Sequence, residues 1–337
     1  MEPLHIDVDL STFKLQQEMC RLKEGYEVID YNEVMFANVH HIKILGRGSY
    51  GTVYEAFFRG HKVAVKLVNR NCDLTDLITE AERLHRFQHS NIIRFYALFD
   101  GEASGIVMEL MEGGSLGQCI FLLQLLILKL QFISVVHQHK NIVYQLCHVL
   151  NWSLQLCNAL SYLHSHDFVH RDIKPQNMLL SSDYNILKLC DFGTIVNKNN
   201  LTNKEGTFAW MAPEVFESTK YDYKCDIFSF GISLWEIITR KYPFEDLDET
   251  NPFTILWLVA GGLRPPKIDK VPEQLMDLIE RCWSGSPDNR PSLEEIEKIL
   301  RMLIEIFPNA TITPFIDNKT GQESTVPVRK AADLVRN

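Results

Sequence analysis

The sequence predicts an α+β fold in which a small antiparallel sheet with one helix precedes a mostly helical region. Between residues 39 and 68, apolar and polar residues alternate and are interrupted by glycines, which is typical of antiparallel strands. From about residue 150 onward, apolar residues recur at helical spacing. The chain has 337 residues, and at roughly 150 residues per domain this length corresponds to about two units.

The first unit is predicted to hold five strands and one helix. The predicted strands are VHHIKIL, TVYEAFF, HKVAVKLV, NIIRFYALF and GIVMEL. Residues 73–88 carry a helical period through Leu74, Leu77, Ile78, Ala81, Leu84 and Phe87. Residues 1–36 are of mixed polarity, and we interpret them as a loose helical lead-in.

The second unit is predicted to be mostly helical. Apolar periodicity predicts helices around residues 154–163, 228–238, 275–282 and 296–303. Two short strands, MLL and LKLC, are expected between residues 178 and 190. The tail from Phe307 is polar and contains Pro, Thr and Asn, so we expect it to be flexible.

Composition excludes several classes of protein. Hydrophobic residues make up 46% and charged residues 23%, so a disordered or collagen-like chain is excluded. The net charge is −9, from 34 Lys and Arg against 43 Asp and Glu, which argues against nucleic acid as a partner. The eight cysteines contain no C-x-x-C pair, and the acidic N-terminus has no apolar signal region. We therefore expect buried thiols and a cytoplasmic location.

A glycine-rich run suggests phosphate binding. Gly46, Arg47, Gly48, Ser49, Tyr50, Gly51, Thr52 and Val53 form a G-x-G-x-x-G-x-V pattern. Such glycines let backbone amides approach phosphates in dinucleotide-binding folds and in protein kinases, although a plain glycine-rich hairpin is the simpler alternative. The run has no G-K-[ST], which excludes a Walker A loop. It leads into strands, whereas the dinucleotide fingerprint requires a helix.

A lysine follows the glycine-rich run at the end of V-A-V. Lys66 would point its ammonium group at phosphates beneath the glycines, although a lone lysine of this kind is more often a surface residue. An anionic partner is needed to hold it, and the predicted helix offers Glu80 and Glu82. The spacing to Leu84 and the residues after it selects Glu80 and leaves Glu82 as the alternative.

The strongest single signal is the string HRDIKPQN. It places Asp172, Lys174 and Asn177 in one loop, followed by Asp191 in D-F-G. A carboxylate can accept a hydroxyl proton, a lysine can neutralise a phosphoryl group, and an amide with a second carboxylate can hold a hard cation. Chance occurrence of both strings in this order is negligible.

Together these strings resemble the catalytic domain of eukaryotic protein kinases over about residues 39–305. The resemblance implies a bilobal fold, with an antiparallel-sheet N-lobe over about 39–110 and a mostly helical C-lobe over about 111–305. Residues 1–38 then form the lead-in and 306–337 the flexible tail. The resemblance also implies architectural roles for Asp226, as a brace of the catalytic loop, and for Glu214 and Arg290, as an ion pair.

Finer features indicate a subfamily. HRDIKPQN and GTFAWMAPE favour serine/threonine substrates, whereas SLWEIITRKYPF and LIERCW are similar to the tyrosine-kinase-like group. The combination resembles the TGF-β-activated kinase family of MAP kinase kinase kinases. It implies MAP kinase kinases as substrates, stress or immune signalling, and an activator or adaptor protein. The long tail that recruits an adaptor in that family is absent from these 337 residues, which puts that interaction in doubt.

The resemblance assigns roles to individual residues. ATP would lie with its adenine against residues 109–111. The expected ATP-binding residues are Gly46, Arg47, Gly48, Ser49, Tyr50, Gly51, Val53, Ala64, Lys66, Glu80, Met108, Glu109 and Met111. Asn177 and Asp191 would hold Mg²⁺. Asp172, Lys174 and Lys66 would be catalytic.

Regulation is expected in the activation segment, from Asp191 to Glu214. In the resembled family, the arginine equivalent to Arg171 pairs with a phosphorylated residue of this segment. Thr202 and Thr207 are the candidate phosphorylation sites, and Thr207 is also a candidate support for the catalytic loop.

Residues 119–136 do not fit the family pattern. In CIFLLQLLILKLQFISVV, 13 of 18 residues are Val, Ile, Leu or Phe. A single membrane span here would place Lys66 and Asp172 on opposite sides of a bilayer, so no span is expected. A genuine apolar insertion and a gene-model error both remain open. Two other functions also remain, a pseudokinase scaffold and a nucleotide-dependent oxidoreductase.

Overall fold

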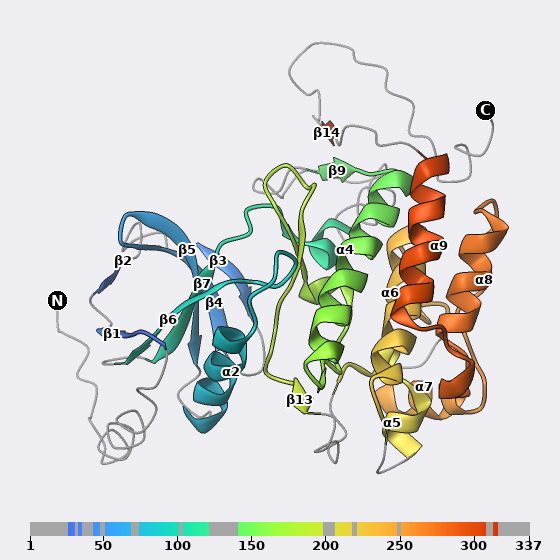
Figure 1. The fold of residues 1–337 in the computed structure, drawn as a ribbon, viewed down its shortest axis with the longest axis horizontal. Coiled ribbons are helices and arrows are strands. Elements are labelled where there is room, and N and C mark those ends of the chain that lie inside the picture. The colour runs from blue at the N-terminus through green and yellow to red at the C-terminus, as the bar shows by residue number, and fades with distance from the viewer. Residues whose placement is uncertain are drawn as a thin grey trace. The chain divides into compact units, whose positions relative to one another are not determined.

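The computed structural model describes residues 26–30, 33–35, 43–47, 51–68, 74–100, 104–120, 141–197, 206–217, 221–247, 251–307 and 313–315 (Figure 1). The chain divides into two compact units. Unit 1 comprises Met1–Met111 and unit 2 comprises Glu112–Asn337. Unit 1 is built on a sheet and unit 2 is mostly helical, which confirms the predicted α+β class.

Unit 1 contains a seven-stranded sheet and helix α2. Its strands are β1 (Val28–Asp30), β2 (Val34–Met35), β3 (Ile44–Arg47), β4 (Gly51–Phe58), β5 (His61–Val68), β6 (Phe95–Asp100) and β7 (Gly105–Glu109). The strand order is β1-β6-β7-β5-β4-β2, and β3 pairs with β4. Helix α2 (Leu74–Arg86) packs against β6 and β7.

The alternation along β4 and β5 sets the core of unit 1. Ala56 pairs with Val63 in the antiparallel register, and directly opposed residues share one face of a sheet. That face buries an apolar cluster, which consists of Ile29, Val34, Ala56, Phe58, Val63, Val65, Ala97, Phe99 and Val107. The intervening residues of β5, Ala64 and Lys66, therefore lie on the opposite face.

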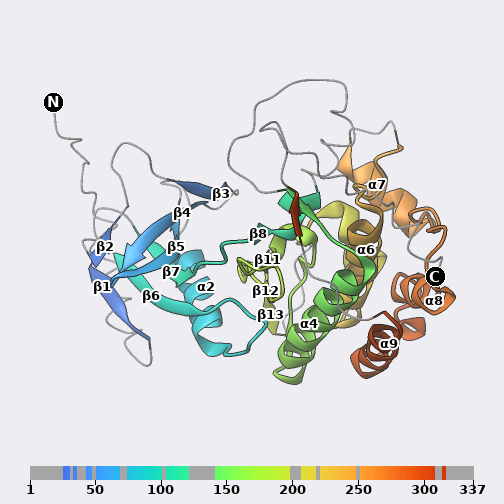
Figure 2. The ribbon, with the colours of Figure 1, turned by 90° about the horizontal axis from the view of Figure 1, so that it is seen from above.

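The order of the strands requires the sheet to curl. β1 and β2 are the two ends of the strand order, yet Val34 lies only four positions after Asp30 in the chain. A flat sheet would place these edges about 24 Å apart, at roughly 4.8 Å per strand spacing. Four residues span at most about 14 Å. The sheet must therefore bend its edges toward each other, and β1 and β2 lie side by side in both views (Figure 1, Figure 2).

The first strands differ from the prediction. Residues 1–36 were expected to form a loose helical lead-in, but β1 and β2 extend the sheet instead. β1 pairs in parallel with β6, and β2 pairs antiparallel with β4. Each strand is too short to show a period in the sequence. Burial of Ile29 and Val34 in the core explains why this segment is extended.

Unit 2 is built from helices with short strand pairs. The helices are α4 (Leu146–Ser165), α5 (Pro213–Glu217), α6 (Lys224–Thr239), α7 (Pro252–Ala260), α8 (Glu273–Cys282) and α9 (Leu293–Ile306). The strands are β8 (Gly114–Ser115), β9 (Asn141–Val143), β10 (Phe168–Val169), β11 (Met178–Leu180), β12 (Leu187–Leu189), β13 (Val196–Asn197) and β14 (Thr313–Phe315). Helices α4, α6, α8 and α9 contain the four predicted helical segments, whereas α5 and α7 were not predicted.

Local signals explain two helix starts. Asn251 precedes α7, and its side chain accepts a hydrogen bond from the backbone N–H of Phe253, with Pro252 in the first turn. Ser292 caps α9 by accepting from the backbone N–H of Glu295. Helix α9 packs against α4, and the two run alongside each other in Figure 2.

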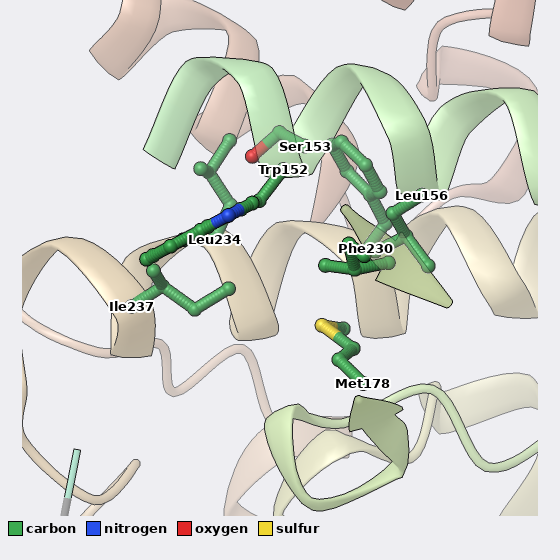
Figure 3. A pocket seen from close by; sticks show the side chains of 8 residues that line it. Trp152, Ser153, Leu156, Met178, Phe230, Leu234 and Ile237 are labelled. Carbon is green, nitrogen blue, oxygen red and sulfur yellow. The ribbon is translucent and has the colours of Figure 1, made fainter. Parts of the chain in front are cut away.

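An apolar core joins α4, α6 and the β11–β12 hairpin (Figure 3). Trp152 and Phe230 are almost completely buried, and Met178 points into the same space. The indole N–H of Trp152 donates to the backbone carbonyl of Tyr184, at 2.8 Å. Met178 directly follows Asn177 in the chain, so this core fixes the loop that carries the predicted site residues.

The C-terminal tail departs from the prediction at one point. β14 pairs antiparallel with β9, whereas the whole tail from Phe307 was expected to be flexible. The apolar segment 119–136 lies outside the described residues, except for Cys119 and Ile120, which are buried. Within the described ranges, no helix combines the length and the apolar character that a membrane span needs. The cysteines described there are all free, and only Cys190 among them is not fully buried.

Candidate active site

Unit 1 contains a buried ion pair. The Lys66 ammonium lies 2.7 Å from each carboxylate oxygen of Glu80, and the two side chains are 14% and 8% exposed. Glu82, the alternative partner, is exposed on α2. The helical period buries Leu77, Ala81 and Leu84 against the sheet, and this orientation also turns Glu80 toward β5. The pairing predicted from spacing is therefore present.

The predicted adenine-covering residues share one face of the sheet with Lys66. In the strand register, Val53 lies opposite Lys66, and Ala64 lies opposite Met108. Opposed residues share a face, and Ala64 and Lys66 are two apart on β5, so all four lie on the face away from the apolar cluster. Glu109 and Met111 are the other residues expected to contact adenine. The backbone N–H of Glu109 donates to the backbone carbonyl of Arg94, and the side chain of Met111 is buried.

The glycine-rich run joins β3 to β4. Gly46 and Arg47 end β3, Gly51 begins β4, and Gly48, Ser49 and Tyr50 lie outside the described residues. A Cβ atom on Gly51 would lie 2.2 Å from the backbone carbonyl oxygen of Leu67, so the close approach of β4 to β5 requires glycine there. A strand follows the run, which argues against the dinucleotide-binding fingerprint.

Unit 2 contains the predicted catalytic loop, residues 170–177, in which both carboxylate oxygens of Asp172 accept hydrogen bonds. One carboxylate oxygen accepts from the backbone N–H of Thr207 at 3.0 Å and from its hydroxyl at 2.7 Å. The other accepts from the Lys174 ammonium at 2.6 Å and from the Asn177 amide at 2.9 Å. The Lys174 ammonium also donates to the Thr207 hydroxyl. The sequence predicted that Asp172, Lys174 and Asn177 lie in one loop. Thr207 is distant in the sequence, and the fold places it in contact with Asp172.

The surroundings of Asp172 keep it ionised. Burial raises its pKa, but the charge of Lys174 and the hydrogen bonds from Lys174 and Thr207 outweigh burial and leave the pKa below the usual value. Burial also lowers the pKa of His170, whose ring packs edge-on against Phe192 at 5.6 Å. The carboxylate of Asp172 is thus a fixed acceptor that can align a hydroxyl group.

Asp226 on α6 holds the backbone of the catalytic loop. Its two oxygens accept the backbone N–H groups of His170 at 2.9 Å and of Arg171 at 2.8 Å. His164 lies 2.9 Å from the same carboxylate. The brace supports a strained backbone at Arg171, whose φ value is 69°. This matches the architectural role that the resemblance implied for Asp226.

The donor set of Asn177 and Asp191 fits a hard divalent cation. Both offer oxygen atoms, which are the ligands that Mg²⁺ prefers, and both lie within unit 2. Asn177 donates its amide hydrogens to the carbonyl and the carboxylate of Asp172, so its amide oxygen is oriented away from them. In the described part of the chain, no group of three or more His, Cys, Asp or Glu is placed to hold a metal ion. Asn177 and Asp191 remain the predicted oxygen ligands.

The activation segment is described only in part. Thr202 lies outside the described residues. Arg171 donates to the backbone carbonyl of Thr194 at 2.6 Å and to the Tyr221 hydroxyl at 3.4 Å. At the end of the segment, Glu214 and Arg290 form a two-pronged ion pair at 2.6 and 2.8 Å.

Sequence reasoning missed Glu236. It lies on α6, is 2% exposed, and accepts a hydrogen bond from the Trp210 indole at 2.9 Å. Burial raises its pKa to about 8. A single glutamate within the apolar string SLWEIIT is the signal that could have found it, because ionisable residues are rarely buried.

The fold and these two clusters define the class of the protein. A family model described as protein tyrosine and serine/threonine kinase matches residues 39–300, and the chain belongs to this family. Among curated proteins, the chain is 38% identical over 289 residues to mitogen-activated protein kinase kinase kinase 7 of Bos taurus and of Homo sapiens. It is 36% identical over 310 residues to putative mitogen-activated protein kinase kinase kinase 7-like of Drosophila melanogaster.

Coverage differs among these relatives. The match to the Bos taurus and Homo sapiens proteins covers 84% of this chain but only 47% and 45% of their lengths. The chain therefore spans less than half of these relatives. The match to the Drosophila melanogaster protein covers 89% of this chain and 72% of the relative.

Proposed function

We propose that the chain is a serine/threonine protein kinase of the MAP kinase kinase kinase type. It would transfer the γ-phosphoryl group of ATP to serine or threonine of MAP kinase kinases in cytoplasmic stress or immune signalling. Membership of the kinase family and the similarity to mitogen-activated protein kinase kinase kinase 7 support this role. An activator or adaptor protein is part of the same proposal.

The observation that carries the proposal is the set of donors around Asp172. Its ionised carboxylate is fixed by Lys174, Asn177 and Thr207. In this arrangement Asp172 would orient the substrate hydroxyl and accept its proton. Lys174 carries a positive charge beside that point and would neutralise charge on the transferring phosphoryl group.

The remaining residues would bind the nucleotide. Lys66, held by Glu80, would bind phosphate oxygens, and the face that carries Val53, Ala64 and Met108 would cover the adenine. Asn177 and Asp191 would hold Mg²⁺, which supplies neutralisation of phosphate charge when it is bound. The protein performs little covalent chemistry of its own in this mechanism; positioning and electrostatics provide the rate.

The contact between Lys174 and Thr207 supports the choice of serine/threonine substrates. Both residues belong to the strings that favoured these substrates, and they meet directly at the carboxylate of Asp172. Thr207, which was also a candidate phosphorylation site, is proposed here as a support of the catalytic loop. Thr202 remains the candidate phosphorylation site of the activation segment.

The test is Mg²⁺-dependent phosphate transfer from ATP to an inactive MAP kinase kinase. Asp172→Asn should abolish transfer while the protein still folds and binds nucleotide. Asp277→Asn is the matched control, because Asp277 is 62% exposed on α8 and should leave transfer unchanged. Nucleotide binding by the wild-type chain without any transfer would instead favour a pseudokinase scaffold. Binding of NAD without ATP would favour an oxidoreductase.

A further inference from the structure

We propose that Tyr26 is a positioning residue for the Lys66–Glu80 ion pair and that it acts by holding helix α2 in place. This inference rests on the proposed kinase function. It concerns a segment that precedes residues 39–300, the part of the chain that the family model matches.

Three aromatic rings tie three elements of unit 1 together. Tyr26 lies just before β1, His85 lies in the last turn of α2, and Phe95 begins β6. The Tyr26 ring centroid lies 5.6 Å from that of His85 and 5.9 Å from that of Phe95. His85 and Phe95 are 5.8 Å apart in an edge-on arrangement. Each ring contacts the other two, at distances where aromatic pairs attract one another.

The main chain around Tyr26 is fixed independently of the rings. The backbone carbonyl of the next residue, Glu27, accepts a hydrogen bond from the backbone N–H of Leu98 at 3.0 Å. β1 then continues in parallel register along β6. The Glu27 carboxylate also pairs with Arg59, in the turn between β4 and β5. Ile29 is buried in the apolar cluster of the sheet. Tyr26 is therefore fixed to the sheet, and its ring contact with His85 can hold the end of α2 in place.

A contact at the C-terminal end of helix α2 can determine where Glu80 lies. His85 follows Glu80 by five residues, which corresponds to about 7.5 Å along a helix axis. A helix moves as a rigid rod over such a length, so a shift at His85 displaces Glu80 relative to Lys66. The buried side chains of Leu77 and Leu84 hold α2 against the sheet, and the rings fix its C-terminal end.

The aromatic ring of Tyr26, and not its hydroxyl group, makes the contacts with His85 and Phe95. Its hydroxyl oxygen is buried and has no hydrogen-bond partner within the described ranges. Burial raises the pKa of Tyr26, and the charge of Glu82 raises it further, so the hydroxyl is neutral. Removal of the hydroxyl should leave the brace intact, whereas removal of the ring should release α2.

The experiment compares Tyr26→Ala with Tyr26→Phe in the full chain, in the wild-type and the Glu80→Gln backgrounds. In the wild-type background, Tyr26→Ala should lower kcat/KM for ATP about tenfold, and Tyr26→Phe should retain it. In the Glu80→Gln background, Tyr26→Ala should have almost no further effect, because the ion pair is already lost. Met35→Ala is the control, since Met35 is 60% exposed on β2.

Hydrogen exchange supplies a readout that does not depend on activity. Amides of α2 from residue 79 to 86 should exchange faster in Tyr26→Ala than in the wild type, while amides of β4 and β5 should not change. If Tyr26→Ala does not fold, Tyr26→Leu takes its place with the same expectations, because leucine keeps apolar volume without the ring.

Two outcomes would overturn the inference. One is a tenfold loss that persists in the Glu80→Gln background, since Tyr26 would then act on stability in general. The other is unchanged exchange of α2 in Tyr26→Ala. A wild-type chain that transfers no phosphate would refute the proposed function instead. In that case, faster exchange of α2 would still support the positioning role, and unchanged exchange would overturn it.

Discussion

Replacement of Glu236 by glutamine should remove a pH-dependent loss of stability. Glu236 is buried on α6, and its carboxyl group accepts a hydrogen bond from the Trp210 indole N–H. Burial raises its pKa from the usual 4.5 to about 8, and the hydrogen bond from Trp210 offsets only part of that increase. Tyr144 and Tyr242 lie close enough to sense its charge, and burial raises the pKa of both.

The magnitude follows from the two pKa values. Below pH 4.5 the carboxyl group is protonated in both the folded and the unfolded chain, so it has no effect on stability. Between pH 4.5 and 8 the unfolded chain ionises while the folded chain stays protonated. Each pH unit in this window lowers the free energy of unfolding by about 1.4 kcal/mol. The total loss at pH 8 is on the order of 4 kcal/mol.

The assay is urea denaturation of the wild type and Glu236→Gln at several pH values from 5 to 8. Glutamine resembles the protonated carboxyl group and can accept the same hydrogen bond from Trp210. The advantage of the variant over the wild type should therefore grow with pH by about 1.4 kcal/mol per unit. Glu305→Gln, at an exposed position on α9, makes the same chemical change and should show no such slope.

A constant difference between Glu236→Gln and the wild type from pH 5 to pH 8 would refute this reasoning. It would mean that Glu236 is ionised in the folded protein throughout the range. A slope of the opposite sign would mean that a positive charge compensates it.

Three further substitutions test the catalytic loop and its supports. Thr207→Val should lower kcat about 10- to 100-fold, because Asp172 loses a hydroxyl donor. Thr207→Ser keeps the hydroxyl group and should retain the wild-type kcat in the same steady-state kinetic assay. Asp226→Asn should destabilise the fold by about 2 to 4 kcal/mol, because two buried backbone N–H groups lose a charged acceptor; unchanged thermal unfolding would contradict this. Arg290→Ala should cost about 3 to 5 kcal/mol by leaving Glu214 without its ion-pair partner. The paired change Arg290→Met with Glu214→Leu should cost less in the same denaturation assay, because no charge remains buried.

Several elements could be predicted from the sequence alone because their signals are local. β5 was predicted with its observed ends, His61 and Val68, because alternation over eight residues has a strong period. The helix predicted over 73–88 is observed over Leu74–Arg86. By contrast, α7 is apolar around most of its surface, so it shows no helical period, and β1 and β2 are too short to show a strand period.

The types of residue at the candidate site were also determined by the sequence. Lys66, Asp172, Asn177 and Asp191 occur in strings that resemble those of protein kinases. The choice of Glu80 over Glu82 followed from the spacing to Leu84 and the residues after it, and the ion pair with Lys66 confirms it.

Only the tertiary structure shows how the supporting residues contact that site, although the resemblance had implied roles for Thr207 and Asp226. Thr207 is 35 residues from Asp172 in the chain, and Asp226 is 56 residues from His170, yet both form direct hydrogen bonds. The tie between Tyr26 and α2 is of the same kind. Such partners depend on how distant segments pack, and local spacing carries no information about that. The pKa of Glu236 is decided in the same way, because burial is a property of the assembled core and not of the residue.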